Sequence, residues 1–408
     1  MLFIDASKGF EKVGKNNKLR ACDIKKIVDV ISARPKYVKK FTRRVERDEI
    51  RKNDYNLHIP RYVDSSEKPE KWDIYASMFG GIPESEVNEF VVYWEAFPNL
   101  KKALFTDDSD AYLHFSTEDI KKTVFGHADI QRFEQEFKTA FEGFDEFLYN
   151  ELIEGMTAVN ISRKESELSE KIFECLNSIY LVDKYEAYQI LDDEWKRIAV
   201  DLEIIQTEGF EATKKVDPNM VMKKKDGKDI EVQDGWVGRV IPFELVQETL
   251  LYDDLAKLKE KESRLAEITA EYESLLDELP EDEKEKDFVN DEKTAFVPDG
   301  VKKAIKENEV EPEILDILKE YEALNTEEKM LKKKVKEQAA ALQISTKKAI
   351  EELTNGQVEE LLKRKWIVPI LSGLYGLPKK VVNEFVAKLE ALAKKYETTF
   401  FAVEEQIR

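Results

Sequence analysis

The stretch that decides the fold runs from Leu251 to Leu279 and reads LYDDLAKLKEKESRLAEITAEYESLLDEL. Large apolar residues recur in it every seven positions, at Leu251, Leu258, Leu265, Tyr272 and Leu279. A second stretch repeats the pattern at Ile317, Leu324 and Leu331, with Val335 in the companion register. A seven-residue apolar repeat is typical of a helix that packs along another helix.

An acidic, proline-interrupted connector, ELPEDEKEKDFVNDEK, separates these two stretches. We therefore expect residues 250–279 and 312–349 to pair as an antiparallel coiled-coil hairpin. The expected seam consists of the apolar repeat positions Leu251, Leu258, Leu265, Tyr272, Ile317, Leu324, Leu331 and Val335. The connector from Glu281 to Glu292 is expected to be too charged for burial. The alternative is a helical arm that fills the protein's own core.

Helical spacing of apolar residues extends over most of the remaining chain, including about 127–152, 165–205 and two helices after 354 that VPILSGLYGLP (368–378) separates. The stretch VDPNMVMKKKDGKDIEV (216–232) predicts a β-hairpin with Asp226-Gly227 at its turn. The predicted fold is mainly α: a helical bundle with a coiled-coil hairpin, an N-terminal strand and a small β-hairpin near 220–242. The predicted divisions of the chain are 1–64, 65–205, 206–242, 243–353 and 354–408.

The N-terminal residues predict a strand at LFIDAS (2–7), a link at KGFEKVGKNNK (8–18) and a helix at CDIKKIVDVI (22–31). We expect Leu2 to Asp5 to be an orphan strand, which exposes unpaired backbone groups and is disordered, packed elsewhere or involved in self-association. Pro60 cannot donate a hydrogen bond to a sheet, so NLHIPRYV (56–63) predicts an edge strand or an extended docking segment.

The charge balance is strongly acidic, with 85 acidic against 65 basic residues and a net charge of −20. Such a chain repels DNA phosphates overall and suits a basic protein partner, although a local basic patch still permits DNA contact. The two cysteines form no disulfide framework, which favours a reduced, cytoplasmic compartment. We expect no membrane span, because no segment has about 18 uninterrupted apolar residues.

Motifs that carry known chemistry are missing from the sequence. It contains no Gly-x-x-x-x-Gly-Lys phosphate loop, and the three histidines, His58, His114 and His127, lack the spacing of metal ligands. It also contains no Gly-x-Gly turn and no two adjacent prolines. We assign no catalytic, cofactor-binding or metal-binding residue, and we expect the chain to be inactive alone.

Two segments are candidates for contact with DNA or a partner. The first, ARPKYVKKFTRRVER (33–47), mixes basic and aromatic residues as nucleic-acid contacts do: Lys36, Tyr37, Lys39, Lys40, Arg43 and Arg44. The second, NDYNLHIPRYVD (53–64), contributes Asn53, Asp54, Tyr55, Asn56, Arg61 and Tyr62, with Arg61 and Tyr62 expected to project. A solvated connector and a structural turn are the respective alternatives.

The chain contains, in this order, LFIDAS, RRVERDEIRKNDYNLHIPRYVD, DIYASMFGGIP, GRVIPFELVQETLL and ELTNGQVEELLKRKWIVPILSGLYGLPKKVVNEF. This succession resembles the C-terminal portion of the modification (M) subunit of type I restriction–modification systems. This family transfers methyl groups to the N6 atom of adenine in DNA. The resemblance implies that LFIDAS is a late strand of the S-adenosylmethionine-binding sheet, and that segment 33–47 lies on the DNA-facing side. It also implies that the N-terminal helical domain and nearly all of the catalytic domain are absent here.

The same resemblance implies partners: a specificity subunit with coiled-coil spacers, a restriction subunit in the full complex, and DNA through the complex. S-adenosylmethionine is the cofactor of the complete subunit, and none is expected in this chain. We therefore expect an assembly region that binds the specificity subunit and helps to clamp DNA. The alternatives are a stand-alone coiled-coil interaction or decoy protein, and a complete enzyme with a pocket around Asp54, Tyr55 and His58.

Overall fold

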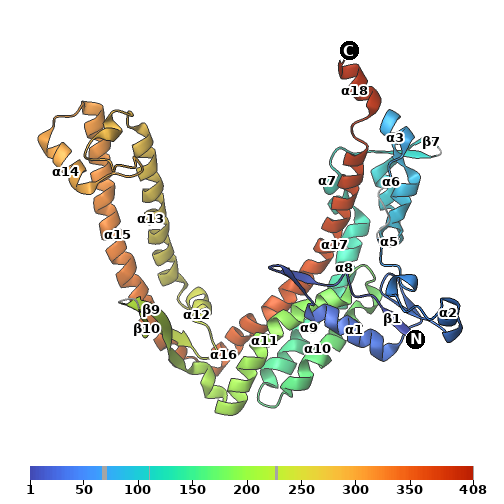
Figure 1. Ribbon diagram of the computed structural model, residues 1–408. Coiled ribbons are helices and arrows are strands. Elements are labelled where there is room, and N and C mark those ends of the chain that lie inside the picture. The colour runs from blue at the N-terminus through green and yellow to red at the C-terminus, as the bar shows by residue number, and fades with distance from the viewer. Residues whose placement is uncertain (67–70, 110, 226–227, 408) are drawn as a thin grey trace. The chain divides into compact units, whose positions relative to one another are not determined.

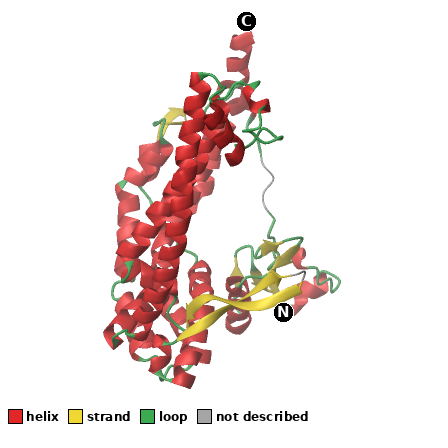
Figure 2. Cartoon of the chain, turned by 90° about the vertical axis from the view of Figure 1, so that its left-hand side faces the viewer, coloured by secondary structure: helices red, strands yellow, loops and turns green. Residues whose placement is uncertain are grey.

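The computed structural model describes residues 1–66, 71–109, 111–225 and 228–407. The chain is mainly helical with a few small antiparallel sheets, as the sequence predicts (Figures 1 and 2). It divides into two compact units, of which unit 1 contains Met1–Gln206 and Trp366–Arg408 and unit 2 contains Thr207–Lys365.

Unit 1 begins with a three-stranded sheet. Strand β1 (Leu2–Ile4) pairs antiparallel with β5 (Thr42–Arg44), and β5 also pairs with β4 (Tyr37–Val38). The ring of Phe3 is buried and stacks on that of Tyr62, with 4.2 Å between the ring centroids. The prediction of an orphan strand is therefore wrong, because residues some forty positions further along the chain supply its partner and its apolar cover.

The other elements of this segment are β2 (Glu11–Val13), β3 (Asn16–Lys18), α1 (Ala21–Ala33) and α2 (Arg47–Lys52). The expected link is in fact the β2–β3 hairpin, whose turn contains Gly14 with a φ of 62°. Around Pro60 the chain forms a 3₁₀ helix, Ile59–Arg61, in place of the expected edge strand. A proline fits here because the first helical positions need no backbone N–H donor.

Short helices and a second small sheet, ordered β6-β8-β7, form the middle of unit 1. In chain order they are α3 (Ile74–Phe79), β6 (Ile82–Pro83), α4 (Glu84–Val87), α5 (Val91–Ala96), α6 (Leu100–Leu104), β7 (Phe105–Ser109), β8 (Tyr112–Phe115), α7 (Ile120–Gly126), α8 (Ala128–Ala140), α9 (Phe144–Tyr149), α10 (Ile161–Cys175) and α11 (Lys184–Glu208). The single helix expected over 127–152 is divided into α8 and α9, because Gly143 between them takes a φ of 73°.

Helix α17 (Val368–Lys395) forms the core of unit 1 against α7 and α8 and is followed by α18 (Phe400–Ile407). The expected break at 368–378 is absent, and Pro378 lies inside the helix. A proline inside a helix removes a backbone hydrogen bond. Burial of Pro378 and its neighbours Leu374 and Leu377 offsets that loss. A Cβ on Gly373 would come within 2.5 Å of Ile190, so glycine permits close approach to α11.

Unit 2 contains a β-hairpin and a long pair of helices. Its elements are β9 (Val216–Lys225), β10 (Lys228–Gly238), α12 (Phe243–Thr249), α13 (Tyr252–Glu278), α14 (Pro298–Glu307), α15 (Pro312–Glu351) and α16 (Asn355–Leu362). Strands β9 and β10 pair antiparallel, as predicted for this region. The predicted turn residues Asp226 and Gly227 lie outside the described residues.

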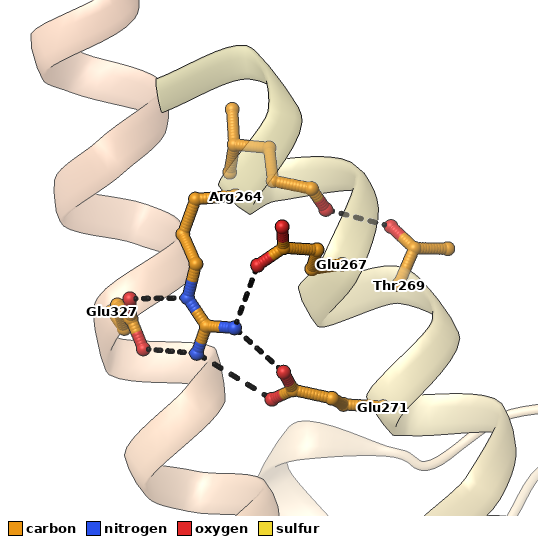
Figure 3. Close-up of polar contacts among 6 residues, drawn as sticks. Arg264, Glu267, Thr269, Glu271 and Glu327 are labelled. Atoms are coloured by element: carbon orange, nitrogen blue, oxygen red, sulfur yellow. Dashed lines mark hydrogen bonds and ion pairs between the residues drawn. The ribbon is translucent and has the colours of Figure 1, made fainter. Parts of the chain in front are cut away.

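Helices α13 and α15 run antiparallel, which confirms the predicted direction of pairing. Arg264 donates two hydrogen bonds to Glu327, at 2.9 and 3.1 Å, and a further one to Glu271 at 2.6 Å (Figure 3). Eight residues further along α13, the ring of Tyr272 packs on that of Tyr321, six residues earlier on α15. Residues with increasing numbers along α13 therefore contact residues with decreasing numbers along α15.

The apolar residues between these helices only partly coincide with the expected seam. Leu258 and Leu324 are buried, Tyr272, Ile317 and Leu331 are partly buried against the same core, and Leu251, Leu265 and Val335 are also partly exposed. The most deeply buried residues are Ile268 and Leu318, which the expected seam did not include. Ile268 lies three residues after the expected seam position Leu265, and Leu318 directly follows Ile317, so the buried face is rotated slightly from the expected one.

The connector between α13 and α14 is not wholly solvated. Phe288 and Val289 are buried against both helices, and Val289 forms a β-bridge with Phe296. The expectation that this connector is too charged for burial is therefore wrong for its apolar residues. The apolar side chains close the end of the helical pair, and most charged side chains are exposed, although those of Glu283 and Lys284 are largely buried.

Candidate nucleic-acid and partner interface

The basic segment predicted at 33–47 forms the β4–β5 hairpin. Tyr37 lies opposite Arg43, and the Arg44 N–H donates to the Lys36 carbonyl at 2.9 Å, so Lys36 lies opposite Arg44. Lys40 lies in the turn with a φ of 60°. The Thr42 hydroxyl donates to the Phe3 carbonyl at 2.6 Å, which fixes the hairpin to β1.

The charges of this hairpin are largely uncompensated. Arg43 is neutralised by Glu49, with contacts of 2.8 and 2.9 Å. Lys36, Lys39, Lys40 and Arg44 are exposed and form no ion pair with another described residue. Like charges directly opposite on neighbouring strands repel each other. A bound anion between Lys36 and Arg44 would therefore relieve the repulsion between these two side chains. Tyr37, 61% exposed, provides a ring beside these cations.

The second predicted segment is a tightly bonded turn after α2. Asp54 and Tyr55 both take left-handed backbone conformations, with φ of 52° and 57°. The Asn56 side chain accepts the His58 N–H at 2.9 Å, and the Tyr62 hydroxyl donates to the Asn56 carbonyl at 2.6 Å. These bonds hold the turn in one conformation, so its exposed residues are presented in a fixed arrangement.

The burial of the turn changes which residues are available for contact. Tyr62 is 4% exposed and stacks on Phe3, so the expectation that it projects is wrong; it supports the turn from beneath. Arg61 is exposed as expected. Asp54, Tyr55 and His58 are also exposed on the outside of the turn. Leu57 and Ile59 are exposed apolar residues that the sequence reasoning did not select.

A second surface that sequence reasoning missed lies on α1. Ile24, Val28 and Ile31 are each about half exposed and follow the spacing i, i+4, i+7, which places them on one face of the helix. Their spacing is a visible signal of an apolar stripe, but α1 also buries Cys22 and Val30 on its other side. Only the structure distinguishes the face that packs inside the unit from the face that is left open.

Pockets near this segment include one of about 410 Å³ that Arg20, Glu186 and Gly373 line, and a smaller one. The smaller pocket, of about 200 Å³, lies between the N-terminal segment and α11, beside the Arg20–Asp23 ion pair and Glu186. Ligand sites for small molecules usually measure roughly 300–1,000 Å³. Burial raises the pKa of the adjacent Cys22 thiol to about 11, so this thiol is protonated at neutral pH and is a poor nucleophile.

Within the described part of the chain, no group of three or more His, Cys, Asp or Glu side chains is arranged to hold a metal ion. Across the same residues, no helix combines the length and apolar character that crossing a membrane requires.

Comparison with known proteins relates this segment to a family. The model of the family described as N-6 DNA Methylase matches residues 1–71. The N-terminal segment is therefore similar to that family. It contains β1 to β5, α1, α2 and every residue proposed above for DNA or partner contact at the N-terminus.

Two curated relatives agree with this assignment. The type I restriction enzyme MpnII methylase subunit of Mycoplasma pneumoniae is 40% identical over 74 residues, and the MjaVII methylase subunit of Methanocaldococcus jannaschii is 44% identical over 77 residues. Each match covers 18% of this chain and 13% of the relative. The predicted relationship to type I methylase subunits is therefore confirmed at the N-terminal end of the chain. No solved structure matches the chain.

Proposed function

We propose that this chain is an assembly region of a type I DNA adenine methylase, which binds the specificity subunit and helps to clamp DNA for N6-adenine methylation by the complex. One observation carries the proposal. The segment that matches the N-6 DNA methylase family has a free sheet edge and an exposed apolar helix face, so it is suited to complete a larger domain.

The free edge belongs to β1, which has a neighbour on one side only. Asp5 donates to Phe41 and Met1 accepts from Val45, so these residues direct their backbone groups toward β5. Because hydrogen-bonding direction alternates along an antiparallel strand, Leu2 and Ile4 direct theirs away from β5. Such an edge accepts a further strand. We assign that place to a strand from the remainder of the methylase domain.

The apolar stripe of α1 supports the same assignment. Full burial of a valine or isoleucine side chain is worth about 1.5–3 kcal/mol. Since Ile24, Val28 and Ile31 are each about half exposed, covering all three contributes roughly 2–4 kcal/mol. A covering domain thus gains apolar contact at α1 and backbone hydrogen bonds at β1.

The roles of the other surfaces follow from their charge and shape. The β4–β5 hairpin offers exposed cations to DNA phosphates, as the resemblance of this segment implies. The α13–α15 pair and the overall charge of −20 suit helical and basic surfaces of a specificity subunit.

The test is co-expression of this chain with the remaining part of an M subunit and with a specificity subunit. Val28→Asp places a charge on the α1 stripe, where Val28 is 52% exposed. The matched control is Val200→Asp on α11, where the valine is 55% exposed. We expect Val28→Asp to lower the amount of the remaining M-subunit part that co-purifies with this chain about tenfold or more. Adenine methylation is expected to fall with it, whereas Val200→Asp leaves both unchanged.

Other outcomes select the alternatives. Capture of the specificity subunit without methylation in the reconstituted complex indicates a stand-alone interaction or decoy protein. Methylation by the chain alone indicates a complete enzyme. Equal behaviour of the two aspartate variants contradicts the assignment of the α1 stripe.

A further inference from the structure

The middle of α15 carries a stripe of lysines on one face. The sequence from Lys329 to Lys336 reads KMLKKKVK and contains no acidic residue. Lys329, Lys332, Lys333 and Lys336 follow the spacing i, i+3, i+4, i+7, which places them on one side of a helix. All four are exposed, and they lie away from the side that packs on α13, which carries Leu331 and Val335.

The stripe is only partly neutralised. Lys332 lies 2.6 Å from Glu328, and Lys333 lies 3.9 Å from Glu337. Lys329 and Lys336 form no ion pair with another described residue. Lys334, on the flank of the stripe, is also exposed and has no such partner. In a chain with a net charge of −20 this is a local positive region, which attracts anions even though the whole molecule repels them.

The β9–β10 hairpin lies beside α15 and carries charges of both signs. It packs on α15 within unit 2 (Figure 1). The Lys347 ammonium lies 3.5 Å from the centre of the Trp236 ring. Lys347, eleven residues after Lys336, lies on the same face of α15 as the stripe. The hairpin therefore covers this face around Lys347 and leaves it exposed from Lys329 to Lys336. Lys223 and Lys224 on β9 are exposed, and Lys223 pairs with Asp234 at 3.2 Å.

The dimensions and chemistry of the stripe fit a nucleic-acid backbone. Seven residues of helix span roughly 10 Å, the distance over which one DNA strand presents about three phosphates. A lysine ammonium is a mobile point charge that pairs with phosphate without reading bases.

We propose that the lysine stripe of α15 binds the phosphate backbone of duplex DNA independently of sequence. The proposal deepens the proposed function, because it adds a second DNA contact, in unit 2, to the one at the β4–β5 hairpin. A contact of this kind adds affinity that depends strongly on salt and leaves recognition of the target sequence to other parts of the complex.

The test measures binding of the full chain to a fluorescent duplex of about 30 base pairs, by anisotropy between about 50 and 200 mM KCl. In the test variant, Lys329, Lys332, Lys333 and Lys336 are replaced by glutamine. The control replaces four exposed lysines elsewhere in unit 2, Lys302, Lys303, Lys306 and Lys319, and changes the net charge equally. Glutamine is as good a helix former as lysine, so both variants are expected to stay folded, which circular dichroism checks.

For the stripe variant we expect weaker binding, and a slope of log affinity against log salt that is less negative by about 2–4. The control variant should keep the slope of the parent chain. Equal slopes in the two variants overturn the proposal. An unchanged slope together with lost capture of the specificity subunit also overturns it and assigns the stripe to an acidic protein surface. Failure of the Val28→Asp experiment, in contrast, contradicts the assembly role and leaves this slope unaffected.

Discussion

At the scale of single residues, Phe3 connects the start of the chain to the turn that follows α2. Its ring stacks on Tyr62, and its carbonyl accepts a hydrogen bond from Thr42. Tyr62 in turn donates to Asn56, inside the turn that presents Tyr55 and Arg61. One buried aromatic pair therefore supports both the sheet and the exposed contact residues.

Replacement of Phe3 by alanine is expected to cost about 3–5 kcal/mol of local stability, because Phe3 is 6% exposed and the change leaves a cavity. Hydrogen exchange of the Asp5 and Val45 amides reports this locally, since both donate hydrogen bonds across the β1–β5 pair. Phe3→Leu is the control, because it keeps an apolar side chain and is expected to cost clearly less. Unchanged exchange in Phe3→Ala shows that β1 is not held by this contact.

At the scale of elements, the α13–α15 pair combines an apolar core with polar contacts that set its register. Arg264 with Glu327 and Glu271 forms a surface network, and such networks contribute modestly to stability. Their geometry nevertheless specifies which turn of one helix lies beside which turn of the other. The buried apolar residues around Ile268 and Leu318 supply most of the stabilisation.

We expect Ile268→Ala to lower the free energy of unfolding of unit 2 by about 2–5 kcal/mol, because this side chain is fully buried. Leu265→Ala, one turn earlier and partly exposed, should cost clearly less. Urea unfolding of the full chain, followed by circular dichroism, compares the two. A larger effect at Leu265 contradicts the packing described here and restores the seam that the heptad pattern predicts.

At the scale of the whole molecule, the distribution of charge matters more than its sum. The chain carries 20 more acidic than basic residues, yet exposed cations gather on the β4–β5 hairpin and on α15. A protein of this kind binds polyanions weakly and locally, and wrong contacts are suppressed by the surrounding negative charge. Such a balance is suited to a component that meets DNA as part of a larger complex.

The chain alone is expected not to bind S-adenosylmethionine. The resemblance to M subunits implies a glycine-rich turn that holds this cofactor, and the sequence contains no Gly-x-Gly turn. Isothermal titration of S-adenosylmethionine into the chain should give no saturable heat. The complex reconstituted with the remaining part of an M subunit is the positive control. Saturable binding to the chain alone in the micromolar range contradicts this prediction.

The sequence by itself determined the features that depend on local periodicity. A seven-residue repeat specified two long helices and their antiparallel pairing, and alternation near 216–238 specified a hairpin. The short succession from LFIDAS to NDYNLHIPRYVD was enough to indicate the methylase family. These signals are readable because each is repeated or contained within a few turns of chain.

Only the tertiary structure decided which surfaces are covered. In the structure β1 pairs with β5, Tyr62 is buried under the turn, and α17 continues past Pro378 without a break. The α1 stripe and the α15 lysines are exposed. The sequence shows the apolar spacing on α1 and the lysine spacing on α15, but it does not show which of these faces is covered, because coverage depends on residues tens to hundreds of positions away. The low helix propensity of Pro378 and the strand-like alternation around Leu2 contribute less free energy than the burial of apolar side chains against distant partners.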